Sequence, residues 1–412
     1  MTKPLCCRSC GKPIHHVVVD LGVSPLSNRY LRDEDLEGLE PFYPLKLRVC
    51  DACWLVQIPE FVPPSDIFRD YAYFSSFSDS WLKHCSDYVD MITDRLKLGP
   101  SSQVVELASN DGYLLQYFVK KGIPATGVEP AANVAEVAIK KGVPTLAEFF
   151  GRKFAHTLIT LGKSADLVIA NNVLAHVPDL NDFIGGIRMI LKPGGVLTGE
   201  FPHLKNLFEQ GQFDTIYHEH FSYFSLIGME NALARHDLVL FDVQQLPTHG
   251  GSLRIFARRK EDTHIAIQPS VKQLRDEEIA AGYQDLEVYR NFRRRVETIK
   301  FDLVSFLIQA RREGKTVAGY GAPAKGNSLL MYCGIRTDLL AYTVDRNPVK
   351  QGRYLPGVRI PICAPEKIAE TKPDYVLILP WNLKNEIVRQ MAHIREWGGK
   401  FVVPIPNLEI IP

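Results

Sequence analysis

The stretch Val104-Val-Glu-Leu-Ala-Ser-Asn-Asp-Gly-Tyr-Leu-Leu115 decides the fold of this 412-residue chain. A short apolar run is followed by a loop of small and polar residues, and then by an apolar-rich segment that continues to Gly122. This order is typical of a strand, a tight loop and a helix. Further strands are predicted within residues 125–130, 165–172 and 194–201, with helices between them. The alternation predicts an α/β fold with a doubly wound, Rossmann-like parallel sheet.

The loop after the first strand departs from the glycine pattern of dinucleotide-binding proteins. In that pattern, glycines let backbone amides approach a pyrophosphate. Ala108 and Asn110 stand at two of the expected glycine positions, which disfavours NAD and favours S-adenosylmethionine, a ligand without a pyrophosphate. Glu129 follows the second strand, where a carboxylate can accept hydrogen bonds from both ribose hydroxyls or remain a solvated acid. The predicted cofactor contacts here are Glu106, Ala108, Asn110, Gly112 and Glu129.

Two C-x-x-C pairs lie near the N-terminus. In a reducing compartment a disulfide framework is not expected, whereas four thiolates suit tetrahedral zinc. Four protein ligands leave no open position, so the zinc would be structural. The alternative is two pairs of reduced surface thiols. Gly11 follows the first pair and Trp54 follows the second. The predicted ligands are Cys7, Cys10, Cys50 and Cys53.

The composition limits the possible partners. Lys and Arg number 48 against 47 Asp and Glu, a net charge of +1, which argues against a nucleic-acid-binding surface. No run of about 18 apolar residues is present, and the first residues lack the apolar core of a signal peptide. We therefore expect a cytoplasmic protein without nucleic-acid or membrane contacts. The oligomeric state expected is a monomer or a weak dimer.

The length predicts three parts, at residues 1–68, 69–265 and 266–412. Residues 270–313 contain few helix breakers and predict one long helix or two. Residues 315–332 then predict a strand, a glycine-rich loop and a helix, and further strands follow. The C-terminal part is therefore expected to be a second Rossmann-like lobe.

Motifs along the whole chain resemble those of the nucleotide-sugar C-methyltransferases. They are the paired C-x-x-C, DYAYFSSFSDSW (70–81), ELASNDGYLL (106–115), FDTIYHEHFSYFS (213–225), HGGSLRIF (249–256) and GYGAPAKGNSLL (319–330). The match runs from Cys7 to Pro404, although Trp54 stands where the family pattern has glycine. The best-known members methylate carbon 3 of thymidine-diphosphate-linked 4-keto deoxysugars. The resemblance implies a zinc-binding N-terminal module, a central class I methyltransferase fold that binds S-adenosylmethionine, and a role in branched-chain sugar biosynthesis.

C-methylation needs a base that removes a proton from a carbon next to a ketone. It also needs a group that stabilises the enolate oxygen. The segment from Tyr217 to His220 supplies candidate groups, and a turn would bring these two side chains together at i, i+3. By resemblance, His220 is the base, and Tyr217 or His218 bonds the enolate or the sugar. Glu219 would orient an imidazole. A half-site for a metal, or a polar surface turn, is the alternative.

Other polar residues are candidates by position or resemblance. Asn171, Asn172 and His176 follow a strand at the carboxyl edge of the sheet, where the cofactor would bind. His176 would contact the methyl donor or the keto oxygen, or else is a polar residue at a helix start. The resemblance makes Tyr73 and Ser75 cofactor contacts and Tyr71 a substrate contact; a capped helix with aromatic packing is the alternative. His249, before two glycines, is a further candidate.

The glycine-rich loop of the C-terminal lobe precedes a helix whose N-terminus can attract a phosphate. Lys325 adds a charge for the diphosphate of a nucleotide sugar. A second NAD or S-adenosylmethionine site, or a structural loop, is the alternative. The predicted substrate contacts are Tyr320, Ala322, Lys325, Asn327 and Arg353.

Two other classes of function remain open. One is an RNA or other small-molecule methyltransferase, and the other is a non-catalytic nucleotide-binding scaffold. The sequence does not identify the nucleoside base, the stereochemistry of the sugar or the methylated carbon.

Overall fold

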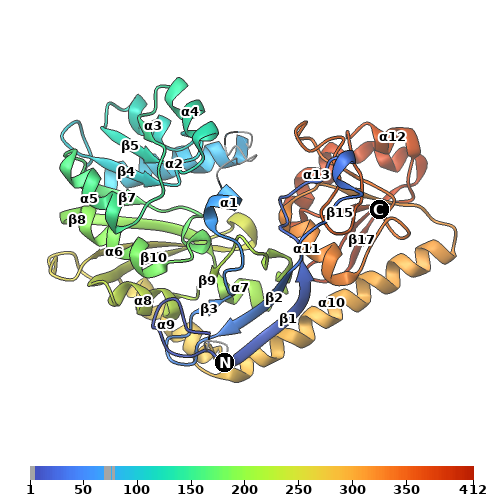
Figure 1. Cartoon of the computed structure of the whole chain (residues 1–412), viewed down its shortest axis with the longest axis horizontal. Helices are drawn as coiled ribbons and strands as arrows, with labels where there is room; N and C mark the ends of the chain where they lie inside the picture. Colours follow the sequence, from blue (N-terminus) through green and yellow to red (C-terminus); the bar gives the residue numbers. More distant parts are fainter. Residues whose placement is uncertain (1–4, 69–75, 77–78) are drawn as a thin grey trace.

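The computed structural model describes residues 5–68, 76 and 79–412. Three sheets organise the chain (Figure 1). A methyltransferase core and a C-terminal lobe lie at opposite ends of the molecule, and the long helix α10 runs from beside β1 along the lower side of the C-terminal lobe. No helix in the described ranges is long and apolar enough to cross a membrane.

The central sheet has seven strands in the order β10-β11-β8-β7-β4-β5-β6. Strands β4 to β8 are parallel, and β11 is antiparallel to both of its neighbours. This is the strand order of class I methyltransferases, so the predicted fold is confirmed. Every residue of β4 is buried, which explains its continuous run without polar alternation. The strands are β4 (Val104–Leu107), β5 (Ala125–Val128), β6 (Thr145–Leu146), β7 (Ala165–Ile169), β8 (Leu191–Pro202), β10 (Leu238–Leu246) and β11 (Ser252–Arg259).

Helices flank this sheet and connect its strands. Helix α2 precedes β4, and its buried side chains join α3 and the sheet in one apolar cluster. The helices are α1 (Pro64–Phe68), α2 (Asp79–Leu96), α3 (Leu115–Lys120), α4 (Ala132–Lys140), α5 (Arg152–Thr160), α6 (Leu180–Ile190), α7 (Leu204–Glu209) and α8 (Leu226–Ala234).

The C-terminal lobe has six strands in the order β14-β13-β12-β15-β16-β17. The first five are parallel and β17 is antiparallel, so the Rossmann-like lobe is also confirmed. The strands are β12 (Val317–Tyr320), β13 (Thr343–Val344), β14 (Ile362–Cys363), β15 (Tyr375–Ile378), β16 (Lys400–Val403) and β17 (Glu409–Ile411). Its helices are α11 (Ala324–Cys333), α12 (Lys367–Thr371) and α13 (Lys384–Gln390).

The helical segment between these sheets forms two helices, α9 (Pro269–Ala280) and α10 (Leu286–Arg312). The break follows from Gly282, whose φ is +85°, and from Asp285, whose carboxylate caps α10 by accepting a bond from the Glu287 amide. Helix α10 packs against β1 and α11 and so connects the N-terminal module to the C-terminal lobe.

The N-terminal module is a four-stranded sheet in the order β1-β2-β3-β9. Its strands are β1 (His16–Ser24), β2 (Tyr43–Val49), β3 (Val56–Gln57) and β9 (Ser222–Tyr223). Strand β9 begins two residues after His220, so the last strand of this sheet comes from the predicted catalytic segment. The apolar side chains of β1 and β2 share a core with α10 and the C-terminal lobe, whereas the four cysteines pack with the methyltransferase core. The boundaries 1–68, 69–265 and 266–412 stay predictions.

Candidate active site

The loop after β4 adopts the backbone conformation that glycines usually provide. Ala108 and Asn110 have φ values of +55° and +47°, in the left-handed region. Gly112 has φ +76°, and a Cβ at this position would lie 2.9 Å from Cγ2 of Val143. The loop therefore keeps the glycine-type turn although two of the glycines are replaced.

Two carboxylates face this loop. Glu129 accepts hydrogen bonds from the amides of Asn110 and Ala131, each at 2.9 Å, and both oxygens keep lone pairs for ribose hydroxyls. Glu106 is 1% exposed, and among the described residues neither of its oxygens has a hydrogen-bond partner. Desolvation raises the pKa of Glu106 well above its usual range. A buried carboxylate without a partner is costly, and a cation such as the ammonium group of S-adenosylmethionine fits it. The residues at this edge therefore fit the expected cofactor.

The structure places the other predicted cofactor contacts nearby or outside its described part. At the end of β7, Asn171 Oδ1 accepts from the Glu200 amide at 3.1 Å, and Asn172 has φ +53°. Tyr71, Tyr73 and Ser75 lie outside the described residues. Ser76, their described neighbour, hydrogen-bonds Asp111 of the loop.

Tyr217 and His220 meet across a turn, with a bond from the His220 amide to the Tyr217 carbonyl. Nδ1 of His220 lies 2.8 Å from the Thr215 carbonyl oxygen, which can only accept, so Nδ1 carries the proton. Nε2 is then the basic nitrogen, and it lies 3.0 Å from the Tyr217 hydroxyl, which donates to it. Desolvation, and after it the neighbouring His176, hold the pKa of His220 well below its usual value. The His176 ring centroid is 4.7 Å away. The neutral base is therefore the form present at pH 7.

His218 and Glu219 face the N-terminal module instead. His218 Nε2 lies 3.2 Å from the Pro44 carbonyl oxygen, and its ring packs edge-on against Tyr43 and Phe61. Glu219 accepts two bonds from the Asn28 side-chain amide, at 2.8 and 2.9 Å. Desolvation raises the pKa of Glu219 to about 7. The turn thus sends Tyr217 and His220 to one side, and His218 and Glu219 to the other.

A second group of side chains comes from α2 and the central sheet. Glu200 forms a buried ion pair with Arg254, and His84 Nε2 lies 2.9 Å from its Oε2. The Trp81 ring stacks on His84 at 4.9 Å between centroids and lies 5.2 Å from the His249 ring. The sequence analysis missed Trp81, His84, Glu200 and Arg254. Charged residues inside the apolar strands at 194–201 and 252–256 were the available signal.

The C-terminal lobe reaches the core through Lys325. Its ammonium bonds Asn382 and lies 4.6 Å from the Trp381 ring centre, and the Trp381 indole donates to Asp214 of the core at 2.7 Å. Desolvation lowers the pKa of Lys325 to about 8 and raises that of Asp214 to about 6. Lys325 therefore sits where the two parts of the chain meet.

The other predicted substrate contacts lie within the lobe. The Ala322 carbonyl oxygen accepts from Tyr30 at 2.7 Å and from Lys350 at 2.9 Å. Tyr320 and Asn327 are buried, and Arg353 is half-buried in the segment between β13 and β14. Among the described residues, no partner hydrogen-bonds the side chain of Asn327.

The four cysteine sulfurs form one cluster. All lie within 4.8 Å of one another, and Cys7–Cys53 and Cys10–Cys50 are each 3.5 Å apart. Tetrahedral zinc with Zn–S bonds of about 2.3 Å needs sulfurs about 3.8 Å apart, so the cluster fits the ion. The two C-x-x-C turns contain the same hydrogen bond. The Gly11 amide donates to the Cys7 carbonyl, and the Trp54 amide donates to the Cys50 carbonyl. Trp54 takes the glycine conformation, with φ +61°, and stacks on Tyr289 of α10.

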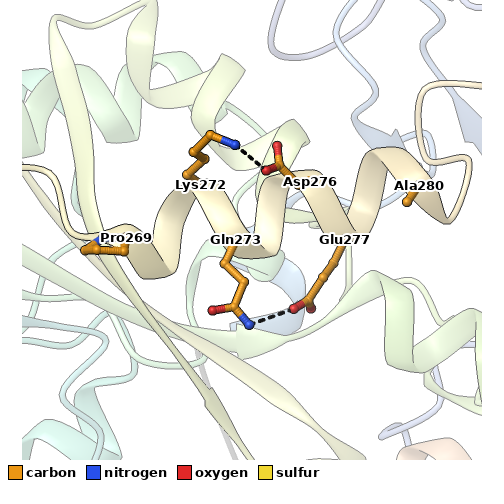
Figure 2. Close-up of a pocket in the computed structure, with 6 residues that line it drawn as sticks. All are labelled: Pro269, Lys272, Gln273, Asp276, Glu277 and Ala280. Atoms are coloured by element: carbon orange, nitrogen blue, oxygen red, sulfur yellow. Dashed lines mark hydrogen bonds and ion pairs between the residues drawn. The ribbon is translucent and has the colours of Figure 1, made fainter.

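The side chains that line a surface hollow on α9 do not form a candidate active site. Figure 2 shows that its side chains bond each other along one helix, Lys272 to Asp276 and Gln273 to Glu277. It contains none of the histidines, tyrosines or carboxylates described above.

Comparisons with known proteins cover nearly the whole chain. Three family profiles match: "Putative zinc binding domain" at 7–68, "Methyltransferase domain" at 81–243 and "C-methyltransferase C-terminal domain" at 247–406. C-methyltransferase NovU of Streptomyces niveus is 38% identical over 405 residues, which is 98% of this chain and 96% of that protein.

Two solved structures each resemble part of the chain. The magnesium protoporphyrin IX methyltransferase of Synechocystis is 16% identical, with a TM-score of 0.33, over 44% of this chain and 82% of that one. A 1,6-didemethyltoxoflavin N1-methyltransferase of Burkholderia thailandensis is 16% identical, with a TM-score of 0.35, over 50% and 95%.

The central sheet and its loop define a class I methyltransferase that uses S-adenosylmethionine, joined to a structural zinc module. The profiles and the likeness to NovU then place it more closely: this chain belongs to the C-methyltransferase family. The family predicted from the motifs is confirmed.

Proposed function

We propose that the enzyme methylates carbon 3, next to the 4-keto group, of a deoxysugar carried on a nucleoside diphosphate. The observation that carries the proposal is the Tyr217–His220 pair, in which Nε2 of a neutral imidazole is the basic nitrogen. A carbon acid next to a ketone needs a base of this kind, whereas a hydroxyl acceptor has no carbon-bound proton to lose. The choice of a sugar as the acceptor comes from the motif resemblance.

S-adenosylmethionine supplies an electrophilic methyl group when it is bound. His220 Nε2 takes the proton from carbon 3, and the electrons of the C–H bond move into the enolate. Carbon 3 of the enolate is then the nucleophile for the methyl group that S-adenosylmethionine, held beside Glu106 and Glu129, would supply. The transfer would restore the ketone and leave the sulfur of the donor neutral. His220 finally releases its proton to solvent. Tyr217 must give up its bond to Nε2 when the substrate arrives.

The charges of the proposed substrate complement this site. The pKa of His220 is low in the free enzyme, which keeps the base unprotonated. A nearby diphosphate would raise that pKa toward neutrality and strengthen the base. Lys325, at the junction with the lobe, is the proposed anchor for the diphosphate.

The test is mass spectrometry of 4-keto-6-deoxy nucleotide sugars incubated in deuterium oxide, with and without S-adenosylmethionine. We expect a gain of one methyl group with the donor, and deuterium uptake at carbon 3 without it. His220→Ala should lower both rates by about 10²–10⁴-fold. His156→Ala, which removes an exposed histidine on α5, is the matched control. Methylation with no deuterium uptake by any ketosugar would contradict the enolate route.

A further inference from the structure

His249 is held in a strained backbone conformation where the core meets the C-terminal lobe. Its φ and ψ are +55° and +23°, which costs about 1–2 kcal/mol for a residue other than glycine. Two glycines follow. A Cβ on Gly250 would lie 2.6 Å from the Trp381 ring, and one on Gly251 would lie 2.1 Å from Nδ2 of Asn206. The backbone that follows His249 is therefore packed tightly between the lobe and α7.

His249 is exposed as a residue, whereas its imidazole is surrounded by groups of the candidate active site. Its ring centroid is 5.2 Å from that of Trp81. It interacts electrostatically with Lys325 of α11, Glu200 of β8 and His84 of α2, and it acts in turn on His220. Desolvation, assisted by Lys325, lowers the pKa of His249 to about 4. At pH 7 it is therefore a neutral imidazole with one N–H to donate.

The proposed reaction also needs a donor for the enolate oxygen, and several polar groups in the described part of the site are already bonded. His218 is bound to Pro44, and Arg254 is paired with Glu200. Tyr217, which leaves His220 Nε2 when the substrate arrives, is a second candidate donor. A neutral imidazole suits the role, because its N–H can polarise a carbonyl without first having to be protonated. The backbone places His249 near both groups. The Gln212 side chain, just before the turn that holds His220, donates to the Gly250 carbonyl at 2.8 Å, and Gly250 packs against the Trp381 ring, whose centre lies 4.6 Å from the Lys325 ammonium.

We propose that the N–H of His249 donates a hydrogen bond to the keto oxygen of the substrate while His220 removes the proton from the adjacent carbon. Charge that develops on this oxygen is then stabilised by a group fixed before the reaction begins. This role rests on the proposed function, since it presupposes an enolate.

The experiment measures deuterium uptake by the ketosugar without a methyl donor, together with kcat, KM and the Kd for S-adenosylmethionine. His249→Ala should lower the exchange rate and kcat by about 10²–10³-fold, with KM and Kd changed by less than about 3-fold. His249→Gln keeps an N–H donor and should recover at least about 10-fold of the loss. His156→Ala again serves as the control.

Each outcome of this experiment tests either the proposed function or the role of His249. No deuterium uptake by the unaltered enzyme would remove the proposed function, whatever His249 does. Uptake by the unaltered enzyme that persists within about 3-fold in His249→Ala would overturn only the role of His249. A parallel loss of kcat and cofactor affinity in both variants would show a structural role and would also overturn it. If His249→Ala does not fold, the His249→Gln variant decides. The role of His249 then requires that kcat falls in this variant while KM and the Kd for S-adenosylmethionine stay unchanged.

Discussion

The loop after β4 in the methyltransferase core and the loop after β12 in the C-terminal lobe share one backbone arrangement. In the core, Glu129 at the end of β5 accepts from the amides of Asn110 and Ala131. In the lobe, Asp345 at the end of β13 accepts from the amides of Ala322 and Asn347, each at 2.8 Å. In both, an acid after the second strand holds the loop after the first.

The two loops differ in what fills the space beside them. The lobe loop is closed by the chain itself, because Tyr30 and Lys350 both bond the Ala322 carbonyl and Lys350 lies 3.7 Å from Asp345. The core loop has Glu106 beside it instead, a buried carboxylate without a partner among the described residues. In the core this loop is the proposed cofactor site, whereas in the lobe the chain itself closes the loop and leaves Lys325, on the helix that follows, as the proposed substrate contact.

The largest expected effect is on the affinity for S-adenosylmethionine, and it distinguishes Glu129 from Asp345. Glu129→Gln and Asp345→Asn each set a side-chain NH₂ against a backbone N–H, and each should lower the free energy of unfolding by about 1–3 kcal/mol. Only Glu129→Gln removes an acceptor from the proposed ribose site. We expect its Kd for S-adenosylmethionine to rise about 100-fold, against less than about 2-fold for Asp345→Asn.

Titration calorimetry gives the two affinities, and urea unfolding gives the two stabilities. An equal rise in Kd for both variants would mean that the loops are not used differently. A normal Kd for Glu129→Gln would remove Glu129 from the cofactor site.

The next effect, on the free energy of unfolding, follows from the tight packing of the loop after β12. Gly321 has φ +87°, and a Cβ there would lie 2.5 Å from Cδ of Pro380. Gly321→Ala should lower the free energy of unfolding by about 3 kcal/mol, through backbone strain and overpacking together. Gly334→Ala is the control, because Gly334 has φ +71° and no atom within 4 Å of the added Cβ. Its loss should be about 1 kcal/mol. Equal losses in urea unfolding would show that Pro380 does not close the loop.

A pH effect tests how the lobe loop is connected to the turn that holds the proposed base. Tyr30 bonds both Ala322 and Asn28, and Asn28 bonds Glu219. Desolvation raises the pKa of Glu219 from 4.5 to about 7, so the folded state binds a proton that the unfolded state has released. The resulting stabilisation is present at low pH and is lost as the pH rises through 7.

The contribution of Glu219 to the free energy of unfolding should therefore fall by about 1.4 kcal/mol between pH 6 and pH 8. Urea unfolding at both pH values measures it, with Glu219→Gln as the reference that lacks this titration. The same pH dependence in both proteins would mean that Glu219 is not buried as described.

Local patterns made the sequence informative about the core. The buried run of β4, the loop from Ala108 to Gly112 and the repeated strand–helix order predict the sheet, because each signal lies within a few neighbouring residues. The i, i+3 spacing of Tyr217 and His220 gave their pairing in the same way.

Long-range pairings were not visible in the sequence. Strand β9 has two residues and pairs with β3, from which most of the methyltransferase core separates it in the sequence. Strands β14, β16 and β17 are too short to show a clear alternation of apolar and polar residues. The pairing of His84 with Glu200 and the closure of the Ala322 loop by Tyr30 join residues far apart in the chain. Such contacts follow from packing of the whole chain, which no local propensity encodes.

The smallest expected effect concerns Ala108, which stands in the core loop at a position where the dinucleotide-binding pattern has glycine. Ala108 has φ +55°, which glycine adopts without cost, so Ala108→Gly should relieve about 1 kcal/mol of strain. Glycine also gives the unfolded chain more freedom, which offsets about 0.4–1 kcal/mol of that gain. We therefore expect a change in the free energy of unfolding of less than about 1 kcal/mol, with an unchanged Kd for S-adenosylmethionine. Ala108 packs against the core, so a larger loss would mean that this contact outweighs the relief of strain. Set beside Gly321→Ala, this near-neutral result would show that the core loop tolerates either residue because it stays open, whereas the lobe loop demands glycine because it is closed.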